Sequence, residues 1–80
     1  MNSLIENLKK LHTTEMGAVR VKRNLQLDIP DVVQWCKTQI LDKNARFEQI
    51  GKNWYITVDG QKITVNAHSY TIITAHKVKT

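Results

Sequence analysis

The 80-residue sequence contains a single cysteine, Cys36, and this scarcity excludes two kinds of architecture. One thiol cannot form an internal disulfide, and it cannot supply the cysteine pairs of a structural zinc site. Cys36 lies on the apolar stripe of a predicted helix, so we expect a buried and unreactive thiol. A small chain without a disulfide fits a reducing compartment, and we expect a cytoplasmic protein whose residues 1–80 form a single domain.

Long apolar runs and common catalytic motifs are also missing. No run of about eighteen apolar residues is present, as a membrane-spanning helix would require, and the segment MNSLIENLKK lacks the apolar region of a signal peptide. The sequence has no P-loop, no G-x-G-x-x-G and no Ser-His-Asp arrangement. Its histidines show no H-x-x-x-H spacing. We therefore expect no metal site, no cofactor and no membrane partner.

What the sequence does contain is an excess of positive charge. Twelve Lys and Arg residues oppose seven Asp and Glu residues, which gives a formal net charge of +5. A balance of this kind favours a polyanionic partner, most often nucleic acid, because the cations can neutralise phosphates. Ordinary solubility explains such a charge equally well in many small domains, so charge alone does not define a site.

The stretch from Lys52 to Lys77 predicts a β-hairpin followed by a further strand. Asp59-Gly60 lies between the β-rich runs WYITV and QKITVN, and this pair favours a two-residue type I′ turn, in which both central residues need a positive φ. Closing the turn pairs Val58 with Gln61, Ile56 with Ile63, Trp54 with Val65, Tyr55 with Thr64 and Thr57 with Lys62. The hairpin should therefore have one apolar face and one polar face rich in hydroxyls.

The register of the last strand, YTIITAHKV, stays open. A two-residue loop before it would direct one set of side chains to the core: Tyr70, Ile72, Thr74 and His76. A three-residue loop would direct Ile73 and Ala75 to the core and leave Tyr70, Thr74 and His76 on the polar face. A one-residue slip exchanges every side chain between the faces. We favour the second register, because burying an unpaired imidazole costs more than exposing Ile72.

Two helices are predicted in the first third of the chain. Ser3 and Glu6 form a capping box that begins a helix running to about His12. Thr13 or Thr14 can cap a second helix, in which Ala18, Val21 and Leu25 form an apolar line. Gly17 lies inside this second pattern and weakens the case for an unbroken helix there.

A third helix and a first strand complete the pattern. Asp28 is the predicted N-cap of the third helix, and Pro30 would occupy its first turn. ARFEQI, at positions 45–50, reads as a strand that precedes the hairpin. The predicted fold class is α+β, with two to three N-terminal helices packed on one face of a four-stranded antiparallel sheet.

Three histidines, His12, His68 and His76, could transfer protons, because the imidazole both accepts and donates near neutral pH. A ribonuclease that works without metal needs a base for the 2′-hydroxyl, an acid for the leaving 5′-oxygen and a cation beside the phosphate. The predicted catalytic residues are His12, Arg20 and His76. For any one histidine, an exposed side chain without a role is the simpler interpretation.

Hydrogen-bonding side chains crowd the segment from position 66 to 74. Such groups can position phosphates and sugars, and the predicted substrate-binding residues are Asn66, His68, Ser69, Tyr70, Thr71 and Thr74. Tyr55 and Tyr70 could also stack on unpaired bases. The same residue types are favoured in ordinary strands and turns, so a structural interpretation fits them nearly as well.

Two segments, LHTTEMGAVRVKRNL and NWYITVDGQKITVNAHSYTIITAHK, resemble a family of short bacterial proteins of unknown function. Members of that family carry H-T-T-E-x-G-x-x-R near the start and N-A-x-S-Y-T-I-I-T-A-H-K at the end. The resemblance covers most of the chain, and it implies little about activity.

A wider resemblance is to the ribonuclease superfamily that includes barnase, EndoU, the colicin ribonucleases and the RelE toxins. Those proteins place catalytic groups on the open face of a four-stranded antiparallel sheet that follows N-terminal helices. The resemblance implies that His12 and Arg20 match the catalytic positions near the early helix. It implies that the catalytic positions on the last strand fall at Ser69, Thr71, Thr74 or His76. The chain departs from barnase-like members because Glu48 is its only strand acid, which leaves the division of catalytic roles open.

These patterns predict a small RNA-binding domain that acts as a metal-independent, toxin-type endoribonuclease, with RNA favoured over DNA. A protein inhibitor or a second copy is a further candidate partner. One alternative is a non-catalytic regulator of phage or mobile-element type that binds nucleic acid or a nucleoprotein. Another is an interaction module that pairs through the edge strand YTIITAHKV. Catalysis predicts that His12, Arg20 and His76 converge, whereas binding alone predicts a spread basic face.

Overall fold

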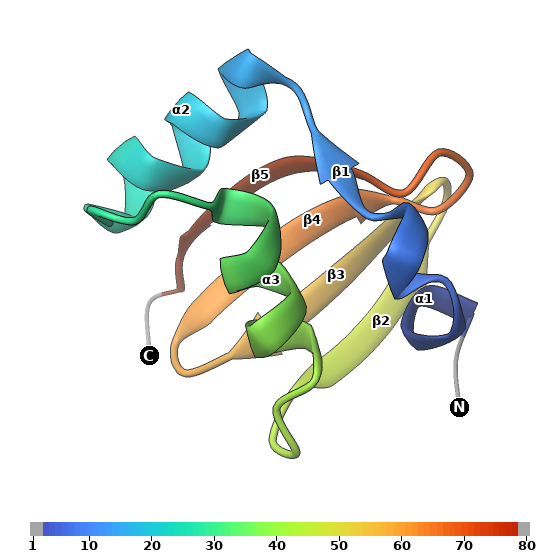
Figure 1. Cartoon of the computed structure of the whole chain (residues 1–80). Coiled ribbons are helices and arrows are strands. Elements are labelled where there is room, and N and C mark those ends of the chain that lie inside the picture. The colour runs from blue at the N-terminus through green and yellow to red at the C-terminus, as the bar shows by residue number, and fades with distance from the viewer. Residues whose placement is uncertain (1–2, 79–80) are drawn as a thin grey trace.

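The structure is a computed structural model that describes residues 3–78, and it has the predicted α+β class (Figure 1). Its helical elements are α1 (Ser3–Glu6), the 3-10 helix η1 (Leu8–Lys10), α2 (Glu15–Leu25) and α3 (Val32–Ile40). Its strands are β1 (His12–Thr13), β2 (Arg46–Ile50), β3 (Asn53–Val58), β4 (Gln61–Asn66) and β5 (Thr71–Lys77). The sheet order is β1-β5-β4-β3-β2.

The sheet differs from the prediction of four antiparallel strands because β1 adds a fifth. β1 pairs with β5 in parallel, with His12 opposite Thr71 and Thr13 opposite Ile72. The other neighbouring strands are antiparallel. A two-residue strand is too short to show the alternation of apolar and polar residues from which strands are predicted.

The central hairpin has the predicted register. All five predicted pairs between β3 and β4 are present, from Val58 opposite Gln61 to Trp54 opposite Val65. Asp59 and Gly60 have φ values of 51° and 72°, as a type I′ turn requires. Ile56 and Ile63 are fully buried on one face, so this face forms the core side of the sheet.

A β-bulge in β5 resolves the register that the sequence left open. Val65 pairs with Ile72, but the preceding Thr64 pairs with Thr74, so Ile73 is an extra residue in β5. The bulge shifts the alternation by one position and lets both Ile72 and Ala75 reach the core. The favoured register was right that Ala75 is buried and His76 exposed. It was wrong to place Ile73 in the core and Ile72 outside it, because the bulge leaves Ile73 half-buried and buries Ile72.

The first and third helices are shorter than predicted. α1 ends at Glu6 because Asn7 leaves the helical conformation, with φ −116° and ψ 26°, and the chain continues as the 3-10 helix η1. The N-cap of α3 is Asp31, whose carboxylate accepts from the N–H of Gln34 at 3.0 Å. If Asp28 were the N-cap, Ile29 would be the first helical residue. Ile29 precedes Pro30, and the residue before a proline favours extended conformations over helical ones.

The second helix is continuous through Gly17. Thr14 caps it by accepting from the N–H of Gly17 at 3.0 Å, and Val21 and Leu25 are buried as predicted. Gly17 is also buried, and α2 runs beside β5 at this point (Figure 1). A Cβ atom at Gly17 would lie 3.0 Å from the carbonyl oxygen of Ile72 and closer still to the hydroxyl of Thr13. Glycine therefore permits the close approach of α2 to β5.

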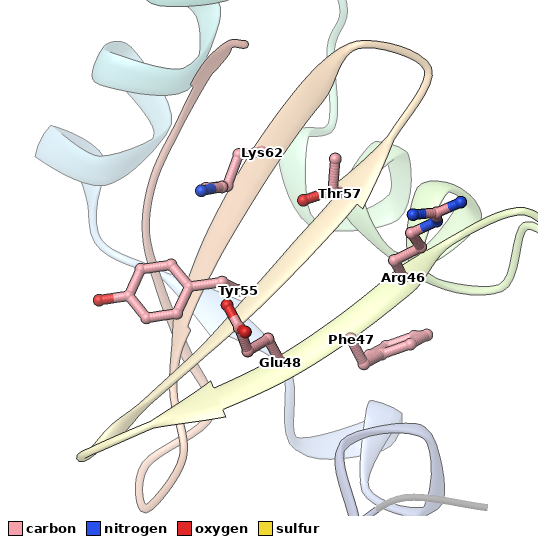
Figure 2. Close-up of a pocket in the computed structure, with 6 residues that line it drawn as sticks. All are labelled: Arg46, Phe47, Glu48, Tyr55, Thr57 and Lys62. Atoms are coloured by element: carbon pink, nitrogen blue, oxygen red, sulfur yellow. The ribbon is translucent and has the colours of Figure 1, made fainter.

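One hydrophobic core joins the helices to the core side of the sheet. Its helical members include Leu4 from α1, Val21 from α2 and Cys36 from α3. Burial raises the pKa of the Cys36 thiol from 9.0 to about 12, which agrees with the predicted buried thiol. No described helix crosses the opposite side of the sheet (Figure 2). We call that side the open face.

The strand β5, predicted as a free edge, is covered along its outer side. β1 pairs with its first two residues. Farther along, the side chain of Asn24 on α2 donates to the Ala75 carbonyl at 3.1 Å and to the Thr74 hydroxyl at 3.3 Å. Among the described strands, the long edge left without a neighbour belongs to β2.

Candidate functional site

Polar side chains from all five strands point to the open face. The pairings between strands, together with the alternation of side chains along each strand, identify its members. They are His12, Arg46, Glu48, Asn53, Tyr55, Thr57, Lys62, Thr64, Asn66, Thr71, Thr74 and His76. The hairpin prediction correctly placed Tyr55, Thr57, Lys62 and Thr64 on this polar face.

A hollow of about 310 Å³ lies on the open face, over β2, β3 and β4. Figure 2 shows Arg46, Thr57 and Lys62 in one line across the three strands, with Glu48 and Tyr55 in the next line. The ammonium group of Lys62 lies 5.9 Å from the centre of the Tyr55 ring, within cation–π range. On the open face, the hollow thus combines the half-buried Tyr55 ring, two cations and one carboxylate.

Phe47 also lines this hollow, from the edge strand β2. Its pairing with Ile56 assigns it to the core side, and its ring packs edge-on against Trp54 at 6.3 Å between centroids. This contact anchors β2 to the hairpin. It thereby fixes the positions of Arg46 and Glu48 on the open face.

A chain of hydrogen bonds lies at the other end of the open face, where β1 meets β5. His12 Nε2 lies 3.0 Å from the Thr71 hydroxyl, and that hydroxyl lies 2.7 Å from the hydroxyl of Ser69. The Ser69 hydroxyl in turn lies 3.2 Å from Asn66 Oδ1. We call these four residues the hydroxyl relay. Its members were predicted as site residues, but their mutual contact was not.

The proton positions in the hydroxyl relay follow from its two ends. His12 Nδ1 lies 2.9 Å from the Lys10 carbonyl, and a carbonyl only accepts, so Nδ1 carries a hydrogen. In the neutral ring, Nε2 then accepts from Thr71. The contacts of Ser69 with Thr71 and with Asn66 Oδ1 then compete for the single hydrogen of the Ser69 hydroxyl. At the far end, Asn66 Oδ1 accepts from the backbone N–H groups of His68 and Ser69, both at 2.9 Å. These bonds fix the orientation of the Asn66 amide.

The three residues predicted as catalytic do not gather at one point. His76 is exposed opposite Lys62, five residues beyond Thr71 along β5, a span of about 17 Å at about 3.3 Å per residue. Arg20 is exposed on α2. It lies one turn before Asn24, on the side of the helix that reaches Thr74. The trio is therefore spread along β5.

The remaining predicted binding residues have structural contacts of their own. Thr74 accepts from Asn24, and His68 is exposed in the turn between β4 and β5. Tyr70 has a φ of 58° and packs against the core. The Lys10 ammonium lies 5.8 Å from the centre of the Tyr70 ring. Tyr70 therefore anchors the turn before β5 to the core, and its side chain is only partly exposed.

Sequence reasoning missed Arg46 and Lys62 as candidate site residues. The signal was available, because Gly51-Lys52 forms a tight turn after β2 and sets Ile50 opposite Asn53. Counting back from this turn places Arg46 opposite Thr57, which faces Lys62 in the predicted hairpin. The two cations could thus have been placed on one face.

Within residues 3–78, no group of three or more His, Cys, Asp or Glu side chains is arranged to hold a metal ion. The helices among these residues are too short or too polar to cross a membrane. A family model described as "Protein of unknown function (DUF3781)" matches residues 5–76. Neither the curated proteins nor the solved structures give a match. The match confirms the resemblance to a family of unknown function, and none of these findings bears on the ribonuclease resemblance.

Proposed function

The chain belongs to the DUF3781 family of proteins of unknown function, and from its structure we propose that it binds single-stranded RNA across the open face. The observation that supports this most directly is the Tyr55 ring in its hollow, with Lys62 beside it and Arg46 lining the same hollow from β2. An aromatic ring on an uncovered sheet can stack on an unpaired base, while neighbouring cations contact the phosphates.

The rest of the open face suits a strand of RNA longer than one nucleotide. Asn53 lies opposite Asn66 of the hydroxyl relay, and its side chain reaches the Tyr55 hydroxyl at 3.5 Å. Amide and hydroxyl groups of this kind form hydrogen bonds with sugars and phosphates. The net charge of +5 adds a general attraction for a polyanion.

The spread of His12, Arg20 and His76 supports binding over cleavage by that trio. Cleavage by His12 and His76 together requires both imidazoles at one phosphate, and the length of β5 between them is too great for that. Binding without cleavage would make the protein a non-catalytic regulator of the kind predicted as an alternative.

The test is fluorescence anisotropy with a labelled, mixed-sequence single-stranded RNA, titrated with the wild type and with Tyr55→Ala. Loss of base stacking should weaken binding by about 1–3 kcal/mol, or roughly 5- to 150-fold, and Tyr55→Phe should retain most of the affinity. Lys62→Gln should weaken binding and lower the salt dependence by about one phosphate contact. Lys37→Gln removes the same charge from α3, on the opposite side of the sheet, and should bind like the wild type.

Two results would end this proposal. One is an absence of RNA binding by the wild type at about 50 mM salt, where phosphate contacts are strong. The other is equal binding by the wild type and Tyr55→Ala, because the open face would then not carry the contact.

A second candidate is self-association through the free edge of β2. If two copies pair their β2 strands antiparallel about Phe47, each Arg46 lies opposite the Glu48 of the other copy. Arg46 and Glu48 are both exposed, and opposite charges across a strand pair stabilise it. Arg46→Glu should then prevent dimers, and the double change Arg46→Glu with Glu48→Arg should restore them in sedimentation experiments. A wild type that stays monomeric at about 0.1 mM would exclude this candidate.

A further inference from the structure

The hydroxyl relay has a chemical capacity that RNA binding does not use. We infer that it accepts the proton of a ribose 2′-hydroxyl and thereby cleaves the bound RNA without a metal, with His12 as the base and His76 taking no part. This inference rests on the proposed RNA binding, because the substrate has to reach the end of the open face that carries His12.

The directions of the hydrogen bonds make His12 the proton acceptor of the relay. Since the Lys10 carbonyl holds the hydrogen on Nδ1, Nε2 is the acceptor of the neutral ring and is aimed at Thr71. When the ring takes up a proton, the bonds between His12, Thr71 and Ser69 reverse. Nε2 then donates to Thr71, Thr71 to Ser69, and Ser69 to Asn66 Oδ1, which lies 3.2 Å away. With the ring neutral, the single hydrogen of Ser69 cannot serve both Thr71 and Asn66, so the proton taken up by the ring completes the relay, as suits a proton acceptor.

The hydroxyl relay is accessible to a ligand. His12 and Ser69 are exposed and Thr71 is half-buried, so a ligand on the open face can reach the hydroxyl end of the relay. Asn66 is part of the relay and is directly opposite Asn53, whose side chain reaches the Tyr55 hydroxyl. A continuous line of polar groups thus connects the hollow, where a nucleobase would stack, with His12, which would take the proton.

The nucleophile of the proposed reaction comes from the substrate and not from Ser69. If the Ser69 hydroxyl attacked a carbonyl, N–H groups nearby would have to stabilise the oxyanion. The N–H groups of His68 and Ser69 both donate to Asn66 Oδ1 instead. Ser69 is therefore suited to pass a proton onward and not to form a covalent intermediate. RNA carries a suitable nucleophile in its 2′-hydroxyl, next to the phosphate that it attacks.

The reaction balances with water acting only as a proton carrier. The 2′-hydroxyl gives its proton to Ser69, Ser69 passes its own to Thr71, and Thr71 passes its own to His12 Nε2. The 2′-oxygen forms a bond to phosphorus while the bond from phosphorus to the 5′-oxygen breaks. The departing 5′-oxygen takes a proton from water, and the hydroxide so formed takes the proton from the imidazolium. The products are a 2′,3′-cyclic phosphate and a free 5′-hydroxyl.

The experiment incubates a pool of random-sequence single-stranded RNA with purified protein in excess EDTA, and it follows binding and cleavage separately. We expect the wild type to produce 2′,3′-cyclic phosphate ends at saturating protein. His12→Ala should slow cleavage by at least about 100-fold, the usual contribution of a general base. Thr71→Val should also slow it, because the substitution breaks the relay, whereas Thr71→Ser keeps a hydroxyl and should retain cleavage. Thr38→Val, on α3, is the matched control.

The outcomes separate this inference from the proposed function. RNA that is bound by the wild type but stays intact overturns the cleavage inference and leaves RNA binding standing. Cleavage by His12→Ala at the wild-type rate also overturns it, because the activity then has another source. RNA that is neither bound nor cut overturns both proposals. If His76→Ala abolishes cleavage while binding persists, the assignment of the base to the relay without His76 is wrong. Circular dichroism of each variant establishes that the fold is intact.

Discussion

Replacing Gly17 with alanine tests how closely α2 lies against β5. In an open helix this change stabilises by about 1 kcal/mol, because alanine is the stronger helix former. Here the added methyl group would lie 3.0 Å from the carbonyl oxygen of Ile72, which belongs to the backbone near the start of β5. The hydroxyl of Thr13 lies in the same space, and it would lose its bond of 3.2 Å to that carbonyl.

The opposing terms give a net loss. Overpacking of a tight contact costs about 1–3 kcal/mol, and the lost hydrogen bond costs about 1 kcal/mol. After subtraction of the helical gain, we expect Gly17→Ala to lower the free energy of unfolding by about 2 kcal/mol. For a domain of this size, the corresponding fall in Tm is roughly 8–16 °C. Thermal unfolding followed by circular dichroism measures it.

Two further variants sharpen the test. Val19→Ala lies on the exposed side of the same helix, and it should change stability by no more than about 0.5 kcal/mol. The double variant Thr13→Ala, Gly17→Ala removes the Thr13 hydroxyl, which can move, but leaves the Ile72 carbonyl in place. It should therefore recover only part of the free energy of unfolding that Gly17→Ala loses. If Gly17→Ala raises the Tm, the close approach of α2 to β5 is wrong.

Three other measurements examine separate parts of the fold. Asn24→Ala should lower stability by about 1 kcal/mol in urea unfolding, because it removes the donor that covers the edge of β5, whereas Asn44→Ala in an exposed turn should not. The folded Cys36 thiol has a pKa of about 12, whereas the unfolded thiol releases its proton near pH 9.0. The free energy of unfolding of the wild type therefore falls above pH 9. Its advantage over Cys36→Ala should shrink by about 1.4 kcal/mol from pH 8 to pH 10. Gly60→Ala should cost about 1–2 kcal/mol because φ is 72° there, and Asp59→Asn should be tolerated; equal stability of Gly60→Ala and the wild type would contradict a type I′ turn.

The parts of the fold that could be predicted are those set by short-range chemistry. The Asp59-Gly60 turn determines the whole register of the hairpin, because a two-residue turn leaves the flanking strands no alternative. Thr14 was a candidate N-cap because its hydroxyl can accept from an N–H three residues later. In each instance the deciding atoms lie within a few positions of one another.

The parts that could not be predicted depend on distant contacts. The bulge at Ile73 places both Ile72 and Ala75 in the core, and the simple alternation assumed for a strand has no place for an extra residue. The pairing of His12 with Thr71 joins two segments that carry no shared local pattern. The candidate residues of the hydroxyl relay could therefore be chosen by their chemistry, but their assembly could not.

The parallel pairing of β1 with β5 also determines when the relay can come into existence. His12 and Thr71 are 59 positions apart, and contacts of high sequence separation form slowly because a long loop has to close first. The hairpin of β3 and β4 is local and needs no such closure. We expect the N-terminal segment to dock onto β5 late in folding, so that a partly folded chain already carries the Tyr55 hollow but not the His12 contact. Capacity to bind RNA would then appear before capacity to cut it.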